Sequence, residues 1–244
     1  MEIKVNNITK KFKNFFAVEN INFIAEENKT LGILGPNGCG KTTTIGMMLG
    51  LVTPSSGTIL IGQKDVNKTD RNEILKRMNF ASPYVELPKK LTVRENLEVY
   101  GRLYGVENLD DRIKEISKDL NLNDFLNKKT GELSSGQKNR VSLAKSLINR
   151  PEILFLDEPT ASLDPDVGDF VRNYIKNYKI KNKVTIILAS HNMREVEKLC
   201  DRVIMMKEGK IVDSGTCKEL ILKHGRDNLE DTFLKIARSK NEMA

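Results

Sequence analysis

Nine consecutive residues have the composition and spacing of a phosphate-binding loop. In order they are Gly35, Pro36, Asn37, Gly38, Cys39, Gly40, Lys41, Thr42 and Thr43. They fit the pattern G-x-x-x-x-G-K-S/T, whose glycines let successive backbone N–H groups turn toward phosphate oxygens. The pattern predicts that Lys41 reaches the β- and γ-phosphates of a nucleotide and that Thr42 binds Mg²⁺. The alternative is a glycine-rich turn with no ligand, which the complete match disfavours.

The sequence on either side of this loop has the character that such a loop needs. Residues 30–34 are short and apolar, as in a buried strand, and residues 44–49 suit a helix. The positive N-terminal end of that helix would face the same phosphate groups.

Two adjacent carboxylates provide a second candidate site. Asp157 and Glu158 directly follow the apolar run Ile153–Leu156, which is typical of a central parallel strand. Ligands in α/β proteins bind at the carboxyl ends of such strands. We expect Asp157 to hold Mg²⁺ through a water, opposite Thr42, and Glu158 to polarise an attacking water as a general base. The alternative is an acidic strand end that caps the next turn.

Residues 134–137 provide a third candidate. Ser134-Ser135-Gly136-Gln137 fits the capping box S-x-x-Q, which opens a helix. The N–H groups at a helix N-terminus attract negative charge, so this end is a candidate anion site. The alternative for Ser134 is a plain helix cap.

The remaining sequence predicts alternating strands and helices. Strands are expected around 3–5 and 21–23, separated by a polar turn at 9–14, and at 58–62, 184–189, 203–206 and 210–212. Helices are expected to begin near 92, 134 and 164, where Asp164 and Pro165 form the start, and to include 113–120, 196–199 and 229–236. Residues after about 238 are expected to fray.

These elements predict an α/β protein with a single domain over residues 1–244. We expect its core in about 1–82 and 151–222, with a helical subdomain inserted at about 83–150. A C-terminal helical tail should occupy about 223–244.

Composition narrows the class of protein. Hydrophobic residues make up 39% and charged residues 30% of the chain. No apolar run reaches the roughly 18 residues of a transmembrane helix, and the polar N-terminus does not resemble a signal peptide. Three scattered cysteines predict neither a disulfide framework nor a zinc site, as in a reducing cytosol. The net charge of +7 is compatible with nucleic acid, an anionic membrane or nucleotide phosphates. The basic residues are dispersed, and no nucleic-acid partner is expected.

Further motifs complete a resemblance to a known family. Leu133-Ser134-Ser135-Gly136-Gln137 resembles the Leu-Ser-Gly-Gly-Gln signature of ABC-type ATPases. Ser162-Leu163-Asp164 resembles the D-loop of that family, Ser190-His191 resembles its switch histidine, and Phe12 resembles its adenine-stacking aromatic. The resemblance covers about residues 2–222. It implies a P-loop NTPase (RecA-like) core with an N-terminal antiparallel β region and an inserted α-helical subdomain.

The resemblance also implies roles for individual residues, with ATP and Mg²⁺ as cofactors. Phe12 would stack on adenine, with Phe15 and Phe16 as alternatives, and His191 would contact the γ-phosphate beside Lys41.

In this family the signature faces the nucleotide of another subunit. Ser134, Gly136 and Gln137 would therefore contact the partner's ATP, which implies a head-to-tail homodimer or heterodimer.

One position departs from the family pattern. The family places a glutamine that contacts Mg²⁺ and water at a position that falls near Pro83, yet the only glutamines of this chain are Gln63 and Gln137. The hydroxyl of Ser82 is a candidate replacement for that contact, directly or through water. Metal sensing and coupling to a partner are the steps that this change affects.

The function implied is that of an ATP-binding and ATP-hydrolysing subunit of an ABC transporter. A separate integral membrane permease would carry the substrate, and this chain would lie on the cytoplasmic, inner face of the cell membrane. The region from Tyr84 to Val106 resembles subunits of ABC-2-type exporters. The alternatives are a soluble ABC-type ATPase acting on ribosomes, nucleic acid or cofactor assembly, and a nucleotide-binding regulator with little hydrolysis.

Overall fold

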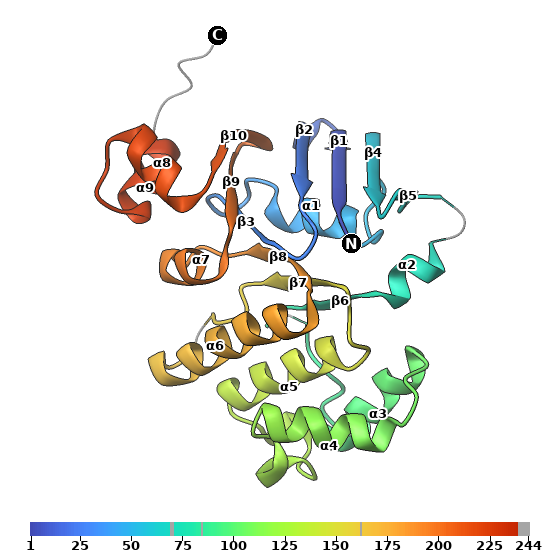
Figure 1. Ribbon diagram of the computed structural model, residues 1–244. Coiled ribbons are helices and arrows are strands. Elements are labelled where there is room, and N and C mark those ends of the chain that lie inside the picture. The colour runs from blue at the N-terminus through green and yellow to red at the C-terminus, as the bar shows by residue number, and fades with distance from the viewer. Residues whose placement is uncertain (69–70, 84, 162, 239–244) are drawn as a thin grey trace. The chain divides into compact units, whose positions relative to one another are not determined.

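The computed structural model describes residues 1–68, 71–83, 85–161 and 163–238, and the chain divides into two compact units. The first comprises Met1–Ile74 and Thr185–Ala244, and the second comprises Leu75–Val184 (Figure 1). The predicted limits of the helical subdomain and the tail stay predictions. The fraying predicted after residue 238 concerns residues outside the described part.

An antiparallel sheet occupies the N-terminal part of the first unit. Its strands are β1 (Ile3–Phe12), β2 (Phe15–Ala25), β4 (Ser56–Ile61) and β5 (Lys64–Asp65), in the order β2-β1-β4-β5. Ile3, Val5 and Ile21 are buried, as the period of two in their spacing predicts.

The polar turn predicted at 9–14 is wrong in its length. β1 continues to Phe12, which pairs with Phe15, and only Lys13 and Asn14 connect the strands. Lys13 adopts a left-handed backbone (φ 51°), which suits a two-residue hairpin turn. The lysines near the end of β1 pair with β2 through their backbone, while their side chains lie at the surface. Their polarity was therefore not evidence of a turn.

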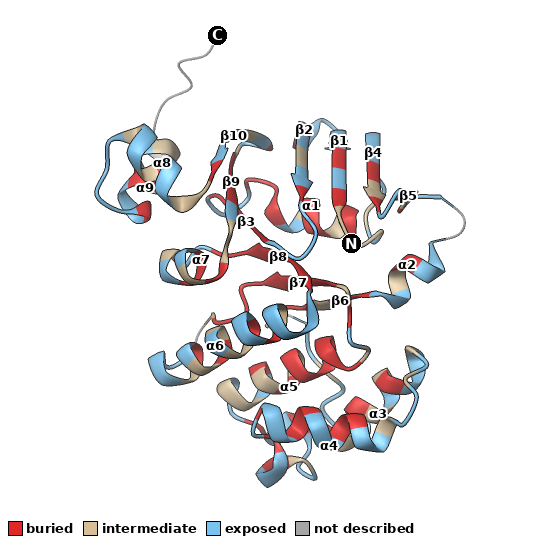
Figure 2. Ribbon diagram, viewed as in Figure 1, coloured by how far each residue is buried: buried red, intermediate tan, exposed pale blue. Residues whose placement is uncertain are grey.

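A second, mostly parallel sheet holds the centre of the first unit. β3 (Thr30–Leu34) lies between β8 (Thr185–Ala189) and β9 (Arg202–Lys207), and β10 (Lys210–Gly215) completes a hairpin with β9. Every residue of β3 and β8 is buried (Figure 2). Helix α1 (Lys41–Met48) follows β3 and contacts both β2 and β8, whereas α7 (Met193–Leu199) follows β8.

The first unit ends in two helices, α8 (Cys217–His224) and α9 (Leu229–Arg238). The helix predicted over 229–236 is confirmed as α9, and it docks on this unit, since Leu229 is fully buried and Phe233 and Ile236 pack beside it. The cluster beneath them consists of Leu34, Val196, Val203, Met205 and Leu220. Helix α8 was not predicted, although Thr216 and Glu219 form a capping box at its start.

The second unit joins a pair of parallel strands to a helical layer. β6 (Met78–Ala81) pairs with β7 (Ile153–Asp157). Helix α5 (Ser135–Leu147) contacts β6, α3 (Val93–Leu103) and α4 (Leu109–Asp119), and lies between the strands and the other two helices (Figure 1). The remaining elements are η1 (Asn123–Phe125), η2 (Thr130–Glu132) and α6 (Pro165–Asn182), while α2 (Asn72–Lys76) crosses the boundary between units.

The capping boxes predicted for two of these helices are confirmed. Thr92 caps α3 together with Glu95, and Ser134 caps α5 together with Gln137. Pro165 occupies the first turn of α6 as predicted, but the side chain of Asp164 accepts no capping hydrogen bond. No helix in the described ranges is long and apolar enough to cross a membrane.

Side chains of α5 and of the turn that follows it cover one edge of β6. Arg77 accepts hydrogen bonds through its carbonyl from the β7 side (Glu152 N, 2.8 Å). The alternate carbonyls therefore point away from β7. Asn149 donates to the carbonyls of Lys76 (2.8 Å) and Met78 (3.3 Å), and the Lys145 ammonium donates to that of Phe80 (2.8 Å). This arrangement occupies backbone groups that an uncovered strand edge would expose.

The burial of Lys145 lowers the pKa of its ammonium group. Only 9% of the residue is exposed, and burial lowers its pKa from 10.5 to about 8. Between those two pH values the folded protein has released a proton that the unfolded chain still binds. The contribution of Lys145 to the free energy of unfolding therefore rises through this window, by about 3 kcal/mol, because one pH unit is worth about 1.4 kcal/mol.

We expect the Lys145→Met substitution to remove this pH dependence. In denaturant titrations from neutral pH upward, the wild type should gain stability relative to the variant as pH rises through about 8. Lys118→Met, at an exposed position of α4, is the matched control and should follow the wild type. Parallel stability profiles for wild type and Lys145→Met would contradict the account.

Candidate functional site

The phosphate-binding loop connects β3 to α1, and close approach of the backbone explains two of its glycines. A Cβ at Gly35 would lie 2.3 Å from the Cys39 sulfur and 2.4 Å from the Met206 carbonyl oxygen. A Cβ at Gly40 would lie 2.5 Å from the carbonyl oxygen of Ala17, and Gly40 has a φ of 108°. Only glycine fits either position.

The charged residue of this loop is held by the loop itself. The Lys41 ammonium donates to the carbonyl oxygens of Gly35 (2.7 Å) and Pro36 (3.1 Å), and the residue is buried. Pro36, Asn37 and Gly38 form the exposed tip. A cation thus lies within a backbone loop at the positive end of α1, which suits an anionic ligand.

The hydroxyl and thiol groups of the loop differ in exposure. Thr42 is exposed and Thr43 is half-buried. Cys39 is buried, and burial raises the pKa of its thiol more than the charge of Lys41 lowers it. The neutral thiol is a poor nucleophile and metal ligand, so Cys39 contributes packing and backbone to the loop.

The turn between β9 and β10 supports the loop, which the sequence did not indicate. Gly209 donates its N–H to the Cys39 carbonyl (3.1 Å) and accepts through its own carbonyl from Glu19 N (2.8 Å). Its φ is 78°, and a Cβ there would lie 3.0 Å from the Ala17 carbonyl. Strands were predicted on either side of Glu208-Gly209, but the contact of this turn with the loop depends on tertiary structure.

His191 lies near the loop in the topology of the first unit. β3 and β8 are neighbouring parallel strands, with Ile33 paired to Ala189. The loop and His191 therefore leave the same edge of the sheet at adjacent strand ends. His191 is exposed and precedes α7, whose N-cap Asn192 accepts from Glu195 N (3.3 Å).

Phe12 ends β1 and is 48% exposed. The Lys10 ammonium lies 4.9 Å from the centroid of its ring. Phe15 and Phe16 are exposed as well. All three rings remain candidates for stacking on a base.

In the second unit, Asp157 and Ser82 leave neighbouring strands. β7 ends at Asp157, β6 ends at Ala81, and Ala81 pairs with Leu156. Asp157, Glu158 and Ser82 are all buried. Ser82 thus follows a strand end adjacent to that of Asp157, and the metal contacts of both residues stay predictions.

The signature segment forms the N-terminus of α5. The Ser134 hydroxyl accepts from Gln137 N (3.3 Å), and the Gln137 side chain accepts from Ser134 N (3.0 Å). Ser134 is exposed and Gly136 is half-buried, so this helix end is accessible. Ser162 of the predicted D-loop lies outside the described residues.

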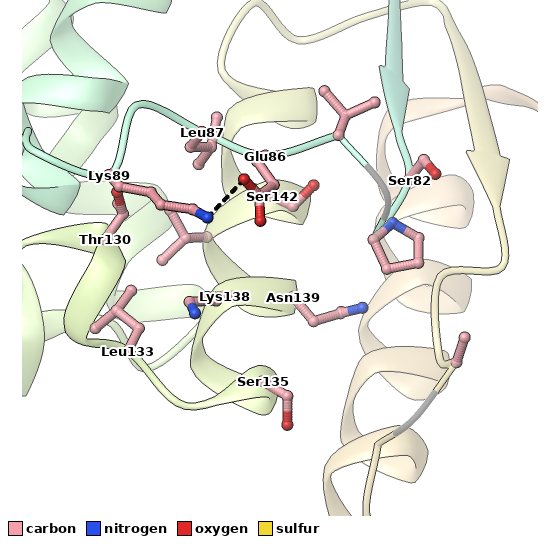
Figure 3. A pocket seen from close by; sticks show the side chains of 14 residues that line it. Ser82, Glu86, Leu87, Lys89, Thr130, Leu133, Ser135, Lys138, Asn139 and Ser142 are labelled. Carbon is pink, nitrogen blue, oxygen red and sulfur yellow. Dashed lines mark ion pairs between the residues drawn. The ribbon is translucent and has the colours of Figure 1, made fainter.

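A cavity of about 290 Å³ lies beside this helix (Figure 3). Ser135, Lys138, Asn139 and Ser142 project into it from α5. The opposite wall comes from residues 82, 83, 85–87 and 89, where Lys89 pairs with Glu86 (2.8 Å).

The residues present fit a nucleotide with a magnesium ion. A Cβ at Gly38 would meet nothing within 4 Å, so the tip of the loop is open to a phosphate. No cluster of three or more His, Cys, Asp or Glu that could hold a metal occurs among the described residues. The predicted ligands are the hydroxyls of Thr42 and Ser82 and the carboxylate of Asp157. Mg²⁺ commonly binds such groups together with substrate phosphates.

Comparisons with known proteins agree with this arrangement. Residues 18–161 match the family described as "ABC transporter". "Nod factor export ATP-binding protein I" of Burkholderia lata is 36% identical over 221 residues, covering 90% of this chain and 72% of that protein. "ABC transporter ATP-binding protein NatA" of Bacillus subtilis is 34% identical over 221 residues, covering 89% of this chain and 89% of that protein.

A solved structure is similar throughout most of its length. It is described as the "dimeric structure of a post-hydrolysis state of the ATP-binding cassette MJ0796 bound to ADP and Pi". Its TM-score is 0.81 at 28% identity, with 88% of this chain and 98% of that chain covered. The chain therefore belongs to the ABC transporter family and is one of its ATP-binding, ATP-hydrolysing subunits.

Proposed function

We propose that this chain hydrolyses ATP to power an exporter through a separate membrane permease. The observation that carries the proposal is the complete loop from Gly35 to Thr43, held between β3 and α1 with the Lys41 ammonium inside it. Export is supported by the similarity to the Nod factor export protein.

In this proposal the loop residues 35–43 bind the phosphates, Lys41 neutralises the β- and γ-phosphates, and His191 contacts the γ-phosphate. Phe12 stacks on adenine, and its exposed ring leaves room for a base. Catalysis of this kind depends mainly on positioning and electrostatics.

Magnesium and water complete the chemistry. Thr42 and, through a water, Asp157 would hold Mg²⁺, with Ser82 as an additional oxygen ligand, directly or through water. When bound, the ion neutralises phosphate charge. Glu158 accepts a proton from the attacking water.

A second ATP-binding subunit would complete each site. Ser134, Gly136 and Gln137 at the start of α5 would contact the ATP bound by the other copy or by a related subunit. The accessible helix N-terminus supports this role. The similar cassette of known structure is dimeric.

The relatives favour transport over the alternative of a soluble ABC-type ATPase. Both bear names of transport proteins, "Nod factor export" and "ABC transporter". We propose that the subunit works at the cytoplasmic face of the cell membrane, bound to its permease.

Replacement of Glu158 by glutamine tests the catalytic part of the proposal. Because the amide cannot accept the proton, steady-state ATP turnover should fall by at least about 100-fold, while ATP binding is retained. The variant should also accumulate as an ATP-bound dimer in size-exclusion chromatography. Glu132→Gln, at an exposed position of the same unit, should hydrolyse ATP like the wild type. A wild type no faster than Glu158→Gln, even with its permease present, refutes the catalytic assignment.

The surface of α3 is the part we propose for contact with the permease. Val99 and Leu103 are large apolar residues on this helix with 44% and 73% exposure. They follow one another by four positions and so lie on one face. Adjacent exposed apolar side chains mark interaction surfaces more often than isolated ones.

A charge on this face should weaken the complex without affecting the ATPase. We expect Leu103→Asp to lower co-purification with the co-expressed membrane subunit by about tenfold, as loss of an interface anchor does. Leu222→Asp is the matched control, because Leu222 is 80% exposed on α8 in the first unit. Equal recovery of the membrane subunit with both variants would exclude this face.

A further inference from the structure

Asn139 joins the signature helix to the chain that follows the candidate catalytic carboxylate. It lies on α5, two residues after Gln137, and is 8% exposed. Its side-chain amide donates a buried hydrogen bond of 2.7 Å to the carbonyl oxygen of Pro159. In Figure 3 the Asn139 side chain extends from α5 on the side away from Leu133.

The acceptor is the residue directly after Glu158. Proline has no N–H, so its carbonyl is the only main-chain hydrogen-bonding group by which residue 159 can be held. Glu158 itself has a φ of 54°, a left-handed conformation that is unfavourable for a side chain of this type. Ala161 N donates to the Glu158 carbonyl (3.0 Å) and closes the turn.

An unfavourable backbone conformation persists only where its surroundings hold it. The Glu158 turn is held on one side by its own hydrogen bond and on the other by the Asn139 amide. The Asn139 amide therefore helps to hold the backbone turn that carries the Glu158 side chain. An amide suits this task because it supplies a donor without adding a charge near the general base.

We propose that Asn139 is a positioning residue that fixes the orientation of Glu158 from the signature helix. The inference rests on the proposed function, since it assigns a support to the same general base. The hydrogen bond of Asn139 also links the signature helix α5 to the segment that follows Glu158. A shift of the N-terminus of α5, where a second subunit's nucleotide would bind, would reach Glu158 through one hydrogen bond.

Three substitutions at Asn139 distinguish the loss of the hydrogen-bond donor from a change in side-chain volume. Asn139→Leu removes the hydrogen bond at similar volume, and Asn139→Asp replaces the donor by an acceptor. Asn139→Gln keeps a primary amide. We expect kcat to fall about 10- to 100-fold in the first two, as for a misplaced catalytic group, with KM for ATP unchanged. Asn139→Gln should recover most of the rate. Ser142→Ala, on the same helix and cavity, is the control and should resemble the wild type.

A double-mutant cycle with Glu158→Gln makes the test decisive. If Asn139 acts through Glu158, adding Asn139→Leu to Glu158→Gln should not slow the residual single-turnover rate further. An undiminished kcat in Asn139→Leu, or an equal loss in both backgrounds, overturns the inference. If thermal melting shows that Asn139→Leu is unfolded, Asn139→Asp takes its place in the cycle with the same criteria. An active Glu158→Gln single variant would instead refute the proposed function, so the two failures are distinguishable.

Discussion

The close approach of backbone groups around residues 35–43, the loop that we propose binds the phosphates of ATP, is the constraint on which the rest of the site depends. Glycines meet this constraint because they have no Cβ. Gly35 and Gly40 lie where any Cβ would collide with Cys39, Met206 or Ala17. The Lys41 ammonium is bound by the carbonyl oxygens of Gly35 and Pro36. Because the loop packs against other backbone, the strands around it fix its shape, and the antiparallel hairpin β9–β10 supports it through Gly209.

Parallel strands then decide where the other functional groups lie. In the first unit, neighbouring strands β3 and β8 end in the loop and in His191. In the second unit, β6 and β7 end in Ser82 and in Asp157. Residues distant in sequence leave adjacent strand ends, which is the arrangement that α/β proteins use for ligands. Helix α5 contributes the signature at its start and, through Asn139 and Lys145, contacts the chain on either side of those strand ends.

The sequence was sufficient for the parts of the fold and site whose signals are local. The loop pattern, the buried strands at 30–34 and 153–156, and the capping boxes at Thr92 and Ser134 each depend on a few adjacent residues. β6, the support from Gly209 and the bonds of Asn139 and Lys145 were missed, because each depends on a main-chain group far away in sequence. The turn at 9–14 was predicted too long because exposed lysines occur in strands as well as in turns.

The central claim is that this chain supplies both the phosphate loop of one ATP site and the signature of another. Mixing two inactive variants tests it directly. Lys41→Ala disables the loop, and Gly136→Asp places a negative charge at the start of α5, where a Cβ meets Val167 only at an ordinary 3.6 Å. An equimolar mixture should recover about a quarter of the wild-type ATPase rate, because about half of random dimers are mixed and each has one intact site. A mixture no more active than the average of the two variants would contradict the claim.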